Sequence, residues 1–389
     1  MGGADDFTVA AMMADACDAT GLDSFGDAIL LEPLGALVSS ILTEARLSDE
    51  ELAGVRAQLV GILRNRLVAE TFFTSHPEIT ERRLGSPLLV IAGGARTGTT
   101  VLHRLLGCDP GLATMKTWQV MAPMPPAGTG PGDPDPRPDL MRARFPKGSS
   151  PVHPMAADEP EEEVFYLQEA FACLLFHLRL YLPGYEQWLR THDLTPAYDL
   201  LVDLLHLNEW RAGVPAGRPR VMKSPQYAHD IQVVTRRFPD AKIVFTHRDP
   251  IKYVGSFLSI HRGTRPGEYP GLDHVERSHE RLEMLEYERD QVAAVRAAQP
   301  AERFFDVLYA DLTRDPIAVV RRVYEFLDRP LTAEAETAMR AWLADNPQGT
   351  GGGHRYTLEE FGLDTAHVDR RFADYRERFS VPREGGIPG

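Results

Sequence analysis

PLLVIAGGARTGTT, residues 87–100, joins a short uninterrupted apolar run to a glycine-rich turn that ends in two threonines. Such a run, closed by glycine, is typical of a parallel strand that is buried on both faces. The residues that follow, Thr99 to Leu106, predict a helix. We therefore expect the turn to lie between the end of a buried strand and the start of a helix, which is the arrangement of an anion-binding loop.

The turn also carries side chains that suit an anion. Its glycines let consecutive backbone N–H groups point at one spot, and the start of the helix adds a partial positive charge. Two threonine hydroxyls can donate hydrogen bonds, and Arg96 can make a forked contact with a phosphate or sulfate. The alternative is a turn that merely connects strand to helix. We prefer the anion site because the cation and the hydroxyls occur together.

The turn departs from the loop of nucleoside triphosphatases. That loop has lysine directly after its second glycine, whereas this chain has Thr99 there and places Arg96 two residues before Gly98. The departure argues against ATP hydrolysis. The triplet His247-Arg248-Asp249 is similar to part of a kinase catalytic loop, but the asparagine required five residues after the aspartate is Val254.

Strands and helices alternate along the rest of the chain. Further strands are expected at 219–223, 241–246 and 303–310, each followed by a helix. A later helix opens at Asp315-Pro316, an N-cap followed by proline in the first turn. This alternation predicts an α/β fold, a three-layer parallel sheet with helices on both faces. Helical periodicity over residues 8–84 predicts a helical N-terminal extension.

The expected domain organisation has three parts. Residues 1–85 are expected to form the helical extension, 86–345 the α/β domain and 346–389 a C-terminal tail that closes over a bound cofactor. The α/β domain contains a proline-rich insert, residues 121–160, whose eleven prolines are too many for regular structure. We interpret the insert either as a disordered segment or as a loop that covers the substrate.

Composition narrows the class of protein. The 389 residues include 42 basic and 56 acidic side chains, and the net charge of -14 argues against a nucleic-acid or anionic-membrane surface as the main partner. Three cysteines without CxxC spacing argue against a zinc ribbon and a disulfide framework. No basic leader precedes an apolar run, and no window approaches about 18 consecutive apolar residues. We expect a cytoplasmic protein without a membrane span, and its oligomeric state stays open.

Four motifs resemble those of the sulfotransferases that use 3'-phosphoadenosine 5'-phosphosulfate, particularly the bacterial branch. The likeness covers roughly residues 87–328 and a short C-terminal patch. The matching segments are Ala95-Arg96-Thr97-Gly98-Thr99-Thr100, Arg248 with Ser256 eight positions on, Pro219 to Pro225, and Leu308 to Asp311 with Asp315-Pro316. Each motif alone is weak, but their shared order and spacing make the resemblance strong.

The resemblance implies a nucleotide-binding fold related to that of P-loop kinases. It implies transfer of a sulfuryl group to a hydroxyl or amine of a small-molecule or lipid-like acceptor, with adenosine 3',5'-bisphosphate as the second product and no metal required. Lys223 is implied to approach the transferring group, and Arg96 to help neutralise charge on the leaving phosphate. The residues implied to bind the donor are Arg96, Thr97, Gly98, Thr99, Thr100, Arg248, Ser256, Tyr309 and Arg355.

The general base is the weakest part of the match. Pro225 stands where the best-known branch has a histidine base, and Gln119 stands where related bacterial sequences have a glutamate. His153 is the first candidate because a neutral imidazole has suitable basicity near pH 7, and Glu162 is the second. Glu162 belongs to an acidic run at residues 159–163, of which at least two members are expected to form a solvated first helical turn.

Two other functions stay open at this point. A nucleotide-dependent kinase or related phosphotransferase would require magnesium and bind ATP rather than the bisphosphate. A catalytically inactive nucleotide-binding scaffold would explain Pro225 and Gln119.

Overall fold

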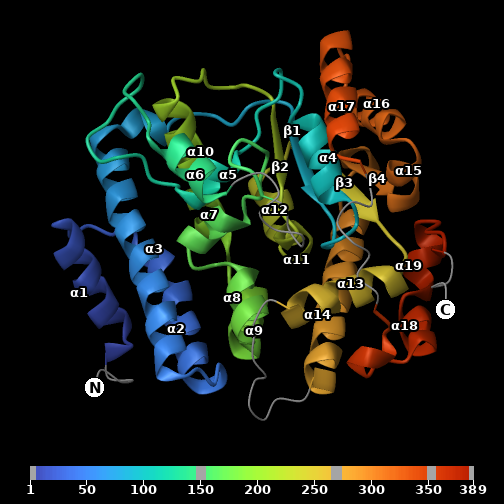
Figure 1. Cartoon of the computed structure of the whole chain (residues 1–389), viewed down its shortest axis with the longest axis horizontal. Coiled ribbons are helices and arrows are strands. Elements are labelled where there is room, and N and C mark those ends of the chain that lie inside the picture. Colours follow the sequence, from blue (N-terminus) through green and yellow to red (C-terminus); the bar gives the residue numbers. More distant parts are fainter. Residues whose placement is uncertain (1–5, 146–154, 264–273, 348–355, 385–389) are drawn as a thin grey trace. The chain divides into compact units, whose positions relative to one another are not determined.

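The computed structural model describes residues 6–145, 155–263, 274–347 and 356–384. Within these residues, four strands form one parallel sheet in the order β2-β1-β3-β4 (Figure 1). Their bounds are β1 Leu88–Ala92, β2 Arg220–Lys223, β3 Lys242–His247 and β4 Phe304–Leu308. Each strand lies where an apolar run of the sequence predicts one, and the parallel arrangement is confirmed.

The register of the sheet brings distant segments to one edge. Ile91 of β1 lies beside Lys223, the last residue of β2. His247, the last residue of β3, lies beside Leu308, the last residue of β4. Because the carboxyl ends of parallel strands meet at the same edge, the residues that follow each strand converge there.

On one face of the sheet, α4 (Thr99–Leu106), α16 (Pro316–Phe326) and α17 (Ala333–Asp345) pack around a buried aliphatic cluster. The strand residues in this cluster are Leu89, Ile91, Val221, Val244 and Val307. α16 begins as predicted, with Asp315 Oδ1 accepting a hydrogen bond from the Ala318 N–H at 3.0 Å. The apolar strand residues and the N-cap of α16 can both be identified in the sequence.

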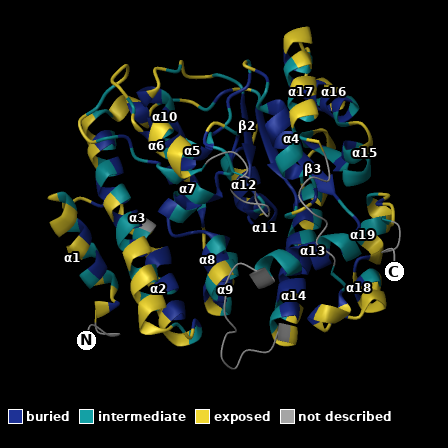
Figure 2. Ribbon diagram, in the orientation of Figure 1, coloured by how far each residue is buried: buried dark blue, intermediate teal, exposed yellow. Residues whose placement is uncertain are grey.

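The opposite face is covered by α11 (Gln226–His229), α12 (Ile231–Arg237) and α14 (His274–Ala297). Alternate strand residues such as Val90 and Met222 point to this face and are also 0% exposed. Figure 2 shows the strands in dark blue, with partly exposed helices around them. Burial on both faces explains the uninterrupted apolar run of β1. The expected three-layer α/β fold is confirmed.

The remaining helices near the sheet follow its strands or belong to the C-terminal part. α13 (Pro250–Gly263) comes shortly after β3, and α15 (Tyr309–Arg314) directly follows β4. α18 (Thr365–Arg371) contacts α13, and α19 (Ala373–Arg378) contacts α18. Short 3-10 helices lie at Ala301–Arg303 and Glu359–Phe361.

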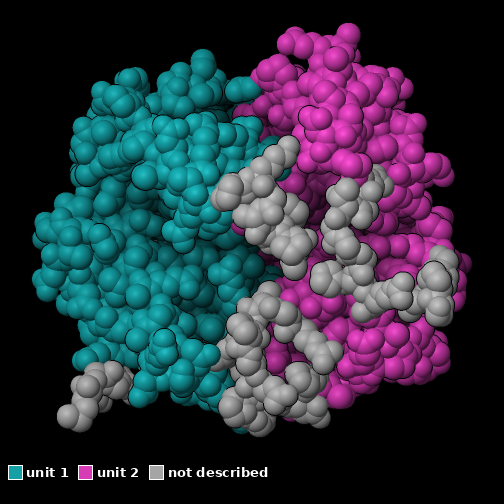
Figure 3. Space-filling view, viewed as in Figure 1, with its two compact units in different colours: residues 1–85, 115–146, 156–218 teal, residues 86–114, 147–155, 219–389 magenta. Residues whose placement is uncertain are grey.

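The chain divides into two compact units, each made of discontinuous segments (Figure 3). Unit 1 consists of residues 1–85, 115–146 and 156–218, and unit 2, which contains the sheet, consists of residues 86–114, 147–155 and 219–389. The three-part domain organisation expected from the sequence stays a prediction.

Unit 1 is helical. Its elements are α1 (Val9–Thr20), a 3-10 helix at Ala28–Leu31, α2 (Glu32–Glu44), α3 (Asp49–Ser75), a 3-10 helix at Pro77–Ile79, α5 (Thr117–Met121), α6 (Arg137–Arg144), α7 (Val164–Glu169), α8 (Leu174–Leu180), α9 (Pro183–Thr191) and α10 (Thr195–Arg211). α3 starts at a capping box, in which Glu51 Oε2 accepts the Ser48 N–H at 2.8 Å and Ser48 Oγ accepts the Glu51 N–H at 3.3 Å. Among the described helices of the chain, none combines the length and apolar character needed to cross a membrane.

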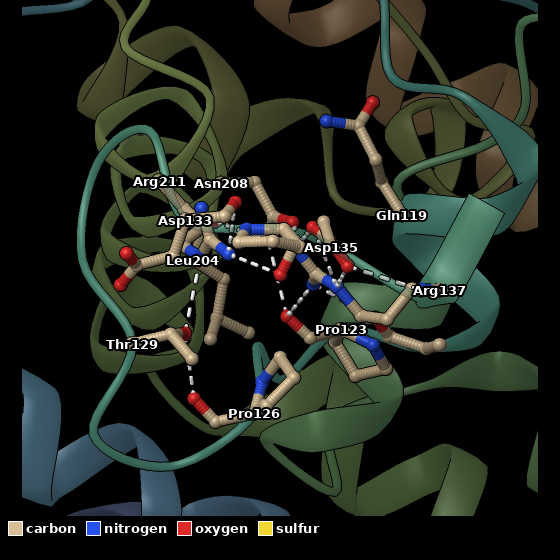
Figure 4. A network of polar contacts seen from close by, with 12 residues as sticks. Gln119, Pro123, Pro126, Thr129, Asp133, Asp135, Arg137, Leu204, Asn208 and Arg211 are labelled. Carbon is tan, nitrogen blue, oxygen red and sulfur yellow. Dashed lines mark hydrogen bonds and ion pairs between the residues drawn. The ribbon is translucent and has the colours of Figure 1, made fainter.

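Two arginines tie the proline-rich segment to α10 (Figure 4). Arg137 Nη1 donates to Asn208 Oδ1 at 3.0 Å, and Arg137 is only 4% exposed. Arg211, at the end of α10, donates from Nε to Thr129 Oγ1 at 3.1 Å. The segment is described at residues 121–145 and 155–160, and the contacts of its first part favour an ordered loop over a disordered insert. The expectation that its prolines exclude regular structure is wrong for α6, because Pro138 lies in the first turn of that helix, where proline is tolerated.

Candidate functional site

The turn between β1 and α4 has the backbone geometry of an anion site. Gly98 is the N-cap of α4 with a φ of +96°, and no side chain caps this helix start. The left-handed backbone favours glycine, and a Cβ at Gly98 would also lie 2.7 Å from Leu312 Cδ2 and displace that methyl group. The first N–H groups of a helix have no partner within the helix. The start of α4 can therefore bind an anion through its backbone.

The threonines of the turn differ in their surroundings. Thr97 is 3% exposed, and its hydroxyl donates to the Gly94 carbonyl at 2.6 Å and shares a hydrogen bond with Thr246. Thr99 is also buried. Thr97 therefore maintains the shape of the turn, whereas the partly exposed Thr100 accepts a hydrogen bond from a lysine.

Lys223 brings a positive charge to the start of α4. Its Nζ donates to Thr100 Oγ1 at 3.1 Å, and the residue is 1% exposed. The position follows from the sheet, because β2 pairs with β1 and Lys223 lies beside Ile91. Lys223 and the turn thus form one end of the candidate site.

A second group of polar side chains lies where β3 ends. Arg96 of the turn donates from Nε to Ser256 Oγ of α13 at 3.3 Å. Arg248 donates from Nη1 to the Arg96 carbonyl at 2.9 Å. Its guanidinium carbon lies 4.1 Å from the centroid of the Tyr309 ring, a cation–π contact. The structure therefore brings together four of the residues that the sequence singled out.

Two members of this second group were not predicted. Glu384 accepts two hydrogen bonds from Arg248, at 2.8 and 2.9 Å. Burial lowers the pKa of Arg248, but the hydrogen bonds and charge of Glu384 outweigh burial, and the pKa is raised overall. Tyr356 donates to the Lys252 carbonyl at 2.9 Å, and burial raises the pKa of its phenol, which stays neutral near pH 7. The only sequence signal was that Tyr356 follows Arg355, and Glu384 had none.

His247 and its neighbour Arg248 contact different groups, because adjacent side chains along a strand point to opposite faces. Its Nε2 lies 2.8 Å from Asp306 Oδ1, and its Nδ1 lies 3.0 Å from the Tyr375 hydroxyl. Burial lowers the pKa of His247 despite the opposing effect of Asp306, so the imidazole stays neutral near pH 7.

The two candidates for the general base stay predictions. Two predicted site residues, His153 and Arg355, lie outside the described residues. Glu162 belongs to unit 1, is partly buried and precedes α7. Its neighbours Glu161 and Glu163 are 2% and 0% exposed, whereas Glu159 is partly exposed like Glu162, so only part of the acidic run is in contact with solvent. The backbone of the run is tied to the residues before α5, since the Glu161 N–H donates to the Met115 carbonyl at 2.9 Å.

Gln119 has a structural contact in unit 1. Its Oε1 accepts a hydrogen bond from the Lys116 N–H at 2.9 Å, which caps the first turn of α5. In Figure 4 its side chain points away from the arginines of the proline-rich segment. The amide therefore stabilises α5 locally.

The chain is similar to known sulfotransferases over most of its length. The model of the sulfotransferase family matches residues 87–333. The chain is 24% identical over 325 residues to the omega-hydroxy-beta-dihydromenaquinone-9 sulfotransferases Stf3 of Mycobacterium bovis and Mycobacterium tuberculosis, covering 80% of this chain and 79% of theirs.

Solved structures agree. The crystal structure of sulfotransferase STF9 from Mycobacterium avium is 30% identical with a TM-score of 0.85, and the match covers 98% of both chains. Sulfotransferase STF1 from Mycobacterium tuberculosis H37Rv is 28% identical with a TM-score of 0.81, covering 94% of this chain and 98% of that one. The matched family region contains the turn, Lys223, Arg248 and Tyr309. This chain belongs to the sulfotransferase family.

Proposed function

We propose that this sulfotransferase uses 3'-phosphoadenosine 5'-phosphosulfate as donor and transfers the sulfuryl group to a hydroxyl, or an amine, of a small-molecule or lipid-like acceptor in the cytoplasm. The observation that carries the proposal is the presence of two cationic groups at one edge of the sheet. Lys223 lies at the turn, and Arg248 lies with Arg96 and Ser256 at the end of β3. A donor with a 5'-phosphosulfate and a 3'-phosphate has two anionic groups to match.

The chemistry of the residues fits this donor. The turn offers backbone N–H groups at the start of α4, where the absence of a side-chain cap leaves room for an anion. Arg248 has the planar guanidinium that matches phosphate geometry. The Ser256 hydroxyl lies close by, because Ser256 accepts a hydrogen bond from Arg96 and Arg248 donates to the Arg96 carbonyl. Tyr309 holds the Arg248 guanidinium against its ring and offers an aromatic edge for the adenine.

The donor, when bound, supplies a sulfuryl group on a phosphosulfate anhydride, whose bridging oxygen gains negative charge as the group leaves. Lys223 and the N–H groups of the turn stabilise charge at that position because they are fixed in advance and shielded from water. Thr100 orients the lysine by accepting its hydrogen bond. As in phosphoryl transfer, most of the catalytic work is positioning and charge stabilisation.

A base must take the proton of the acceptor hydroxyl. Glu162 and His153 are the proposed candidates for this role, because carboxylate and imidazole side chains serve as general bases in enzymes. The variants Glu162→Gln and His153→Ala test which of the two side chains acts as the base.

The proposed class of acceptor is based on the substrate named for a related protein. The Stf3 proteins are named for sulfation of an omega-hydroxy-beta-dihydromenaquinone-9, which is a long lipid-like alcohol. At 24% identity, the likeness supports an alcohol on an apolar molecule as the first class to test.

The experiment is a transfer assay with radiolabelled donor and a panel of prenyl, steroid, phenolic and amine acceptors. We expect labelled product with at least one apolar alcohol and about 10²- to 10³-fold slower formation of that product with Lys223→Met. Parallel titrations with ATP and magnesium test the kinase alternative. Tight binding of the bisphosphate without transfer to any acceptor would favour the inactive scaffold instead.

A further inference from the structure

The forked edge of Arg248 is occupied by a carboxylate of the same chain. Nε donates to Glu384 Oε1 at 2.8 Å, and Nη2 donates to Oε2 at 2.9 Å. Arginine uses this same two-bond geometry to bind a phosphate. Glu384 and a donor 3'-phosphate therefore require the same two N–H groups.

Several contacts hold Glu384 in this position. Its backbone N–H donates to Asp249 Oδ2 at 2.8 Å, and Asp249 is 4% exposed. Arg376 of α19 donates to the other carboxylate oxygen of Asp249 at 2.9 Å. Val381 is also 4% exposed, and its N–H donates to the Arg376 carbonyl at 3.0 Å. Residues 381–384, which we call the C-terminal clasp, are thus docked at the end of β3.

Arg248 itself is fixed by other groups. Its Nη1 donates to the Arg96 carbonyl at 2.9 Å, and its guanidinium lies on the Tyr309 ring. Neither contact uses the forked edge formed by Nε and Nη2. Replacing the Glu384 carboxylate by a phosphate therefore leaves Arg248 in place and requires only the clasp to move.

The two anions cannot share the fork. A carboxylate and a phosphate in contact with the same guanidinium repel each other strongly when both are partly shielded from water. The Arg248 and Glu384 side chains are 15% and 25% exposed, so solvent screens this repulsion only in part.

We infer that Glu384 is a built-in competitor for the 3'-phosphate of the nucleotide: the clasp closes on Arg248 in the free enzyme and opens when a 3'-phosphate binds. The inference rests on the proposed function, which assigns Arg248 to that phosphate. The apparent affinity for 3'-phosphorylated nucleotides is then the intrinsic affinity multiplied by the fraction of molecules whose clasp is open. Nucleotides without a 3'-phosphate bind without this competition. Return of Glu384 to Arg248 assists release of the bisphosphate product.

Calorimetric titration of the full chain with adenosine 3',5'-bisphosphate and with adenosine 5'-monophosphate tests the inference. Glu384→Gln keeps the size of the side chain and removes its charge. We expect it to tighten bisphosphate binding by about fivefold to fiftyfold and to leave monophosphate binding within about twofold. Glu377→Gln is the matched control, because Glu377 is an exposed carboxylate of α19 and its loss changes the net charge equally.

The outcomes separate the inference from the proposed function. Equal bisphosphate affinity in wild type and Glu384→Gln, or weaker affinity in the variant, overturns the competitor role. A wild-type chain that does not bind the bisphosphate, or binds it equally well after Arg248→Met, contradicts the assignment of Arg248 and with it the proposed function.

Hydrogen exchange of the wild-type protein supplies a measurement that needs no variant. The Glu384 N–H is protected by Asp249 while the clasp is closed. We expect the bisphosphate to accelerate exchange over residues 381–384 and the monophosphate to leave it unchanged. Slower exchange in the bisphosphate complex would show that the clasp stays closed on the nucleotide and would overturn the inference.

Discussion

Replacing Lys223 with methionine tests whether its ammonium group stabilises the transition state rather than the bound donor. The group lies 3.1 Å from Thr100 Oγ1, and the residue is 1% exposed. Methionine keeps the length and apolar stem of the side chain, so that the packing of β2 is preserved. The change therefore removes the charge and little else.

The magnitude follows from the burial of the charge. Loss of one preorganised donor in a water-excluded site costs about 3 to 4 kcal/mol of transition-state stabilisation. This corresponds to a reduction in turnover of about 10²- to 10³-fold. Binding of the donor is expected to weaken by less than about tenfold, because the turn and Arg248 still bind its two anionic ends.

The assay compares kcat at saturating donor with the dissociation constant of adenosine 3',5'-bisphosphate. Lys242→Met is the control, since Lys242 begins β3 at the amino edge of the sheet and contacts the Phe326 ring. We expect this control to change neither quantity by more than about twofold. If Lys223→Met lowers turnover and affinity equally, or lowers turnover by less than about threefold, the assigned role is wrong.

Three further predictions follow from the same structure. Arg248→Met weakens bisphosphate binding by about 10- to 10³-fold in calorimetry, because the charged pair between Arg248 and the 3'-phosphate is lost. It changes kcat at saturating donor by less than about fivefold, because this phosphate takes no part in the reaction and the pair stabilises the bound donor and the transition state equally. Gly98→Ala abolishes detectable bisphosphate binding in the same titration, because a Cβ there meets Leu312 at 2.7 Å with φ at +96°. Glu169→Gln makes thermal stability less dependent on pH between about pH 5 and 8, since burial raises the pKa of Glu169 from 4.5 to about 8 against the opposing hydrogen bond from Asn65.

The sign of the Glu169 effect comes from proton binding. The folded carboxyl keeps its proton up to about pH 8, whereas the unfolded chain releases it near 4.5. The folded state thus binds more protons in this window, and wild-type stability falls as the pH rises through it. The expected loss is on the order of several kcal/mol, and a neutral glutamine avoids it. Parallel pH profiles for wild type and variant would contradict the burial argument.

The other two variants have their own decisive results. Arg248→Met would be uninformative about binding only if the protein unfolded, which circular dichroism checks directly. Unchanged affinity in a folded Arg248→Met protein would remove the arginine from the phosphate site. Normal binding by a folded Gly98→Ala protein would show that the turn does not contact the nucleotide.

Much of the site was readable along the chain because its residues stand at the ends of strands. Lys223 ends one expected strand and Arg248 follows another, and the parallel sheet brings the ends of both strands to one edge. The role of Gly98 could also be predicted, because a glycine directly before a helix allows a left-handed φ. Strand ends, caps and glycine turns are local features, and local features are encoded in neighbouring residues.

Side-chain partners far apart in sequence were not readable in this way. Arg248 and Glu384 are separated by 136 positions, and nothing in their local sequence indicates the pair. Glu161 and Glu163 have the pattern of a solvated turn, yet tertiary packing buries both. Only the folded chain decides which distant groups meet and which charges lose water, because those outcomes depend on packing over the whole unit rather than on periodicity within one segment.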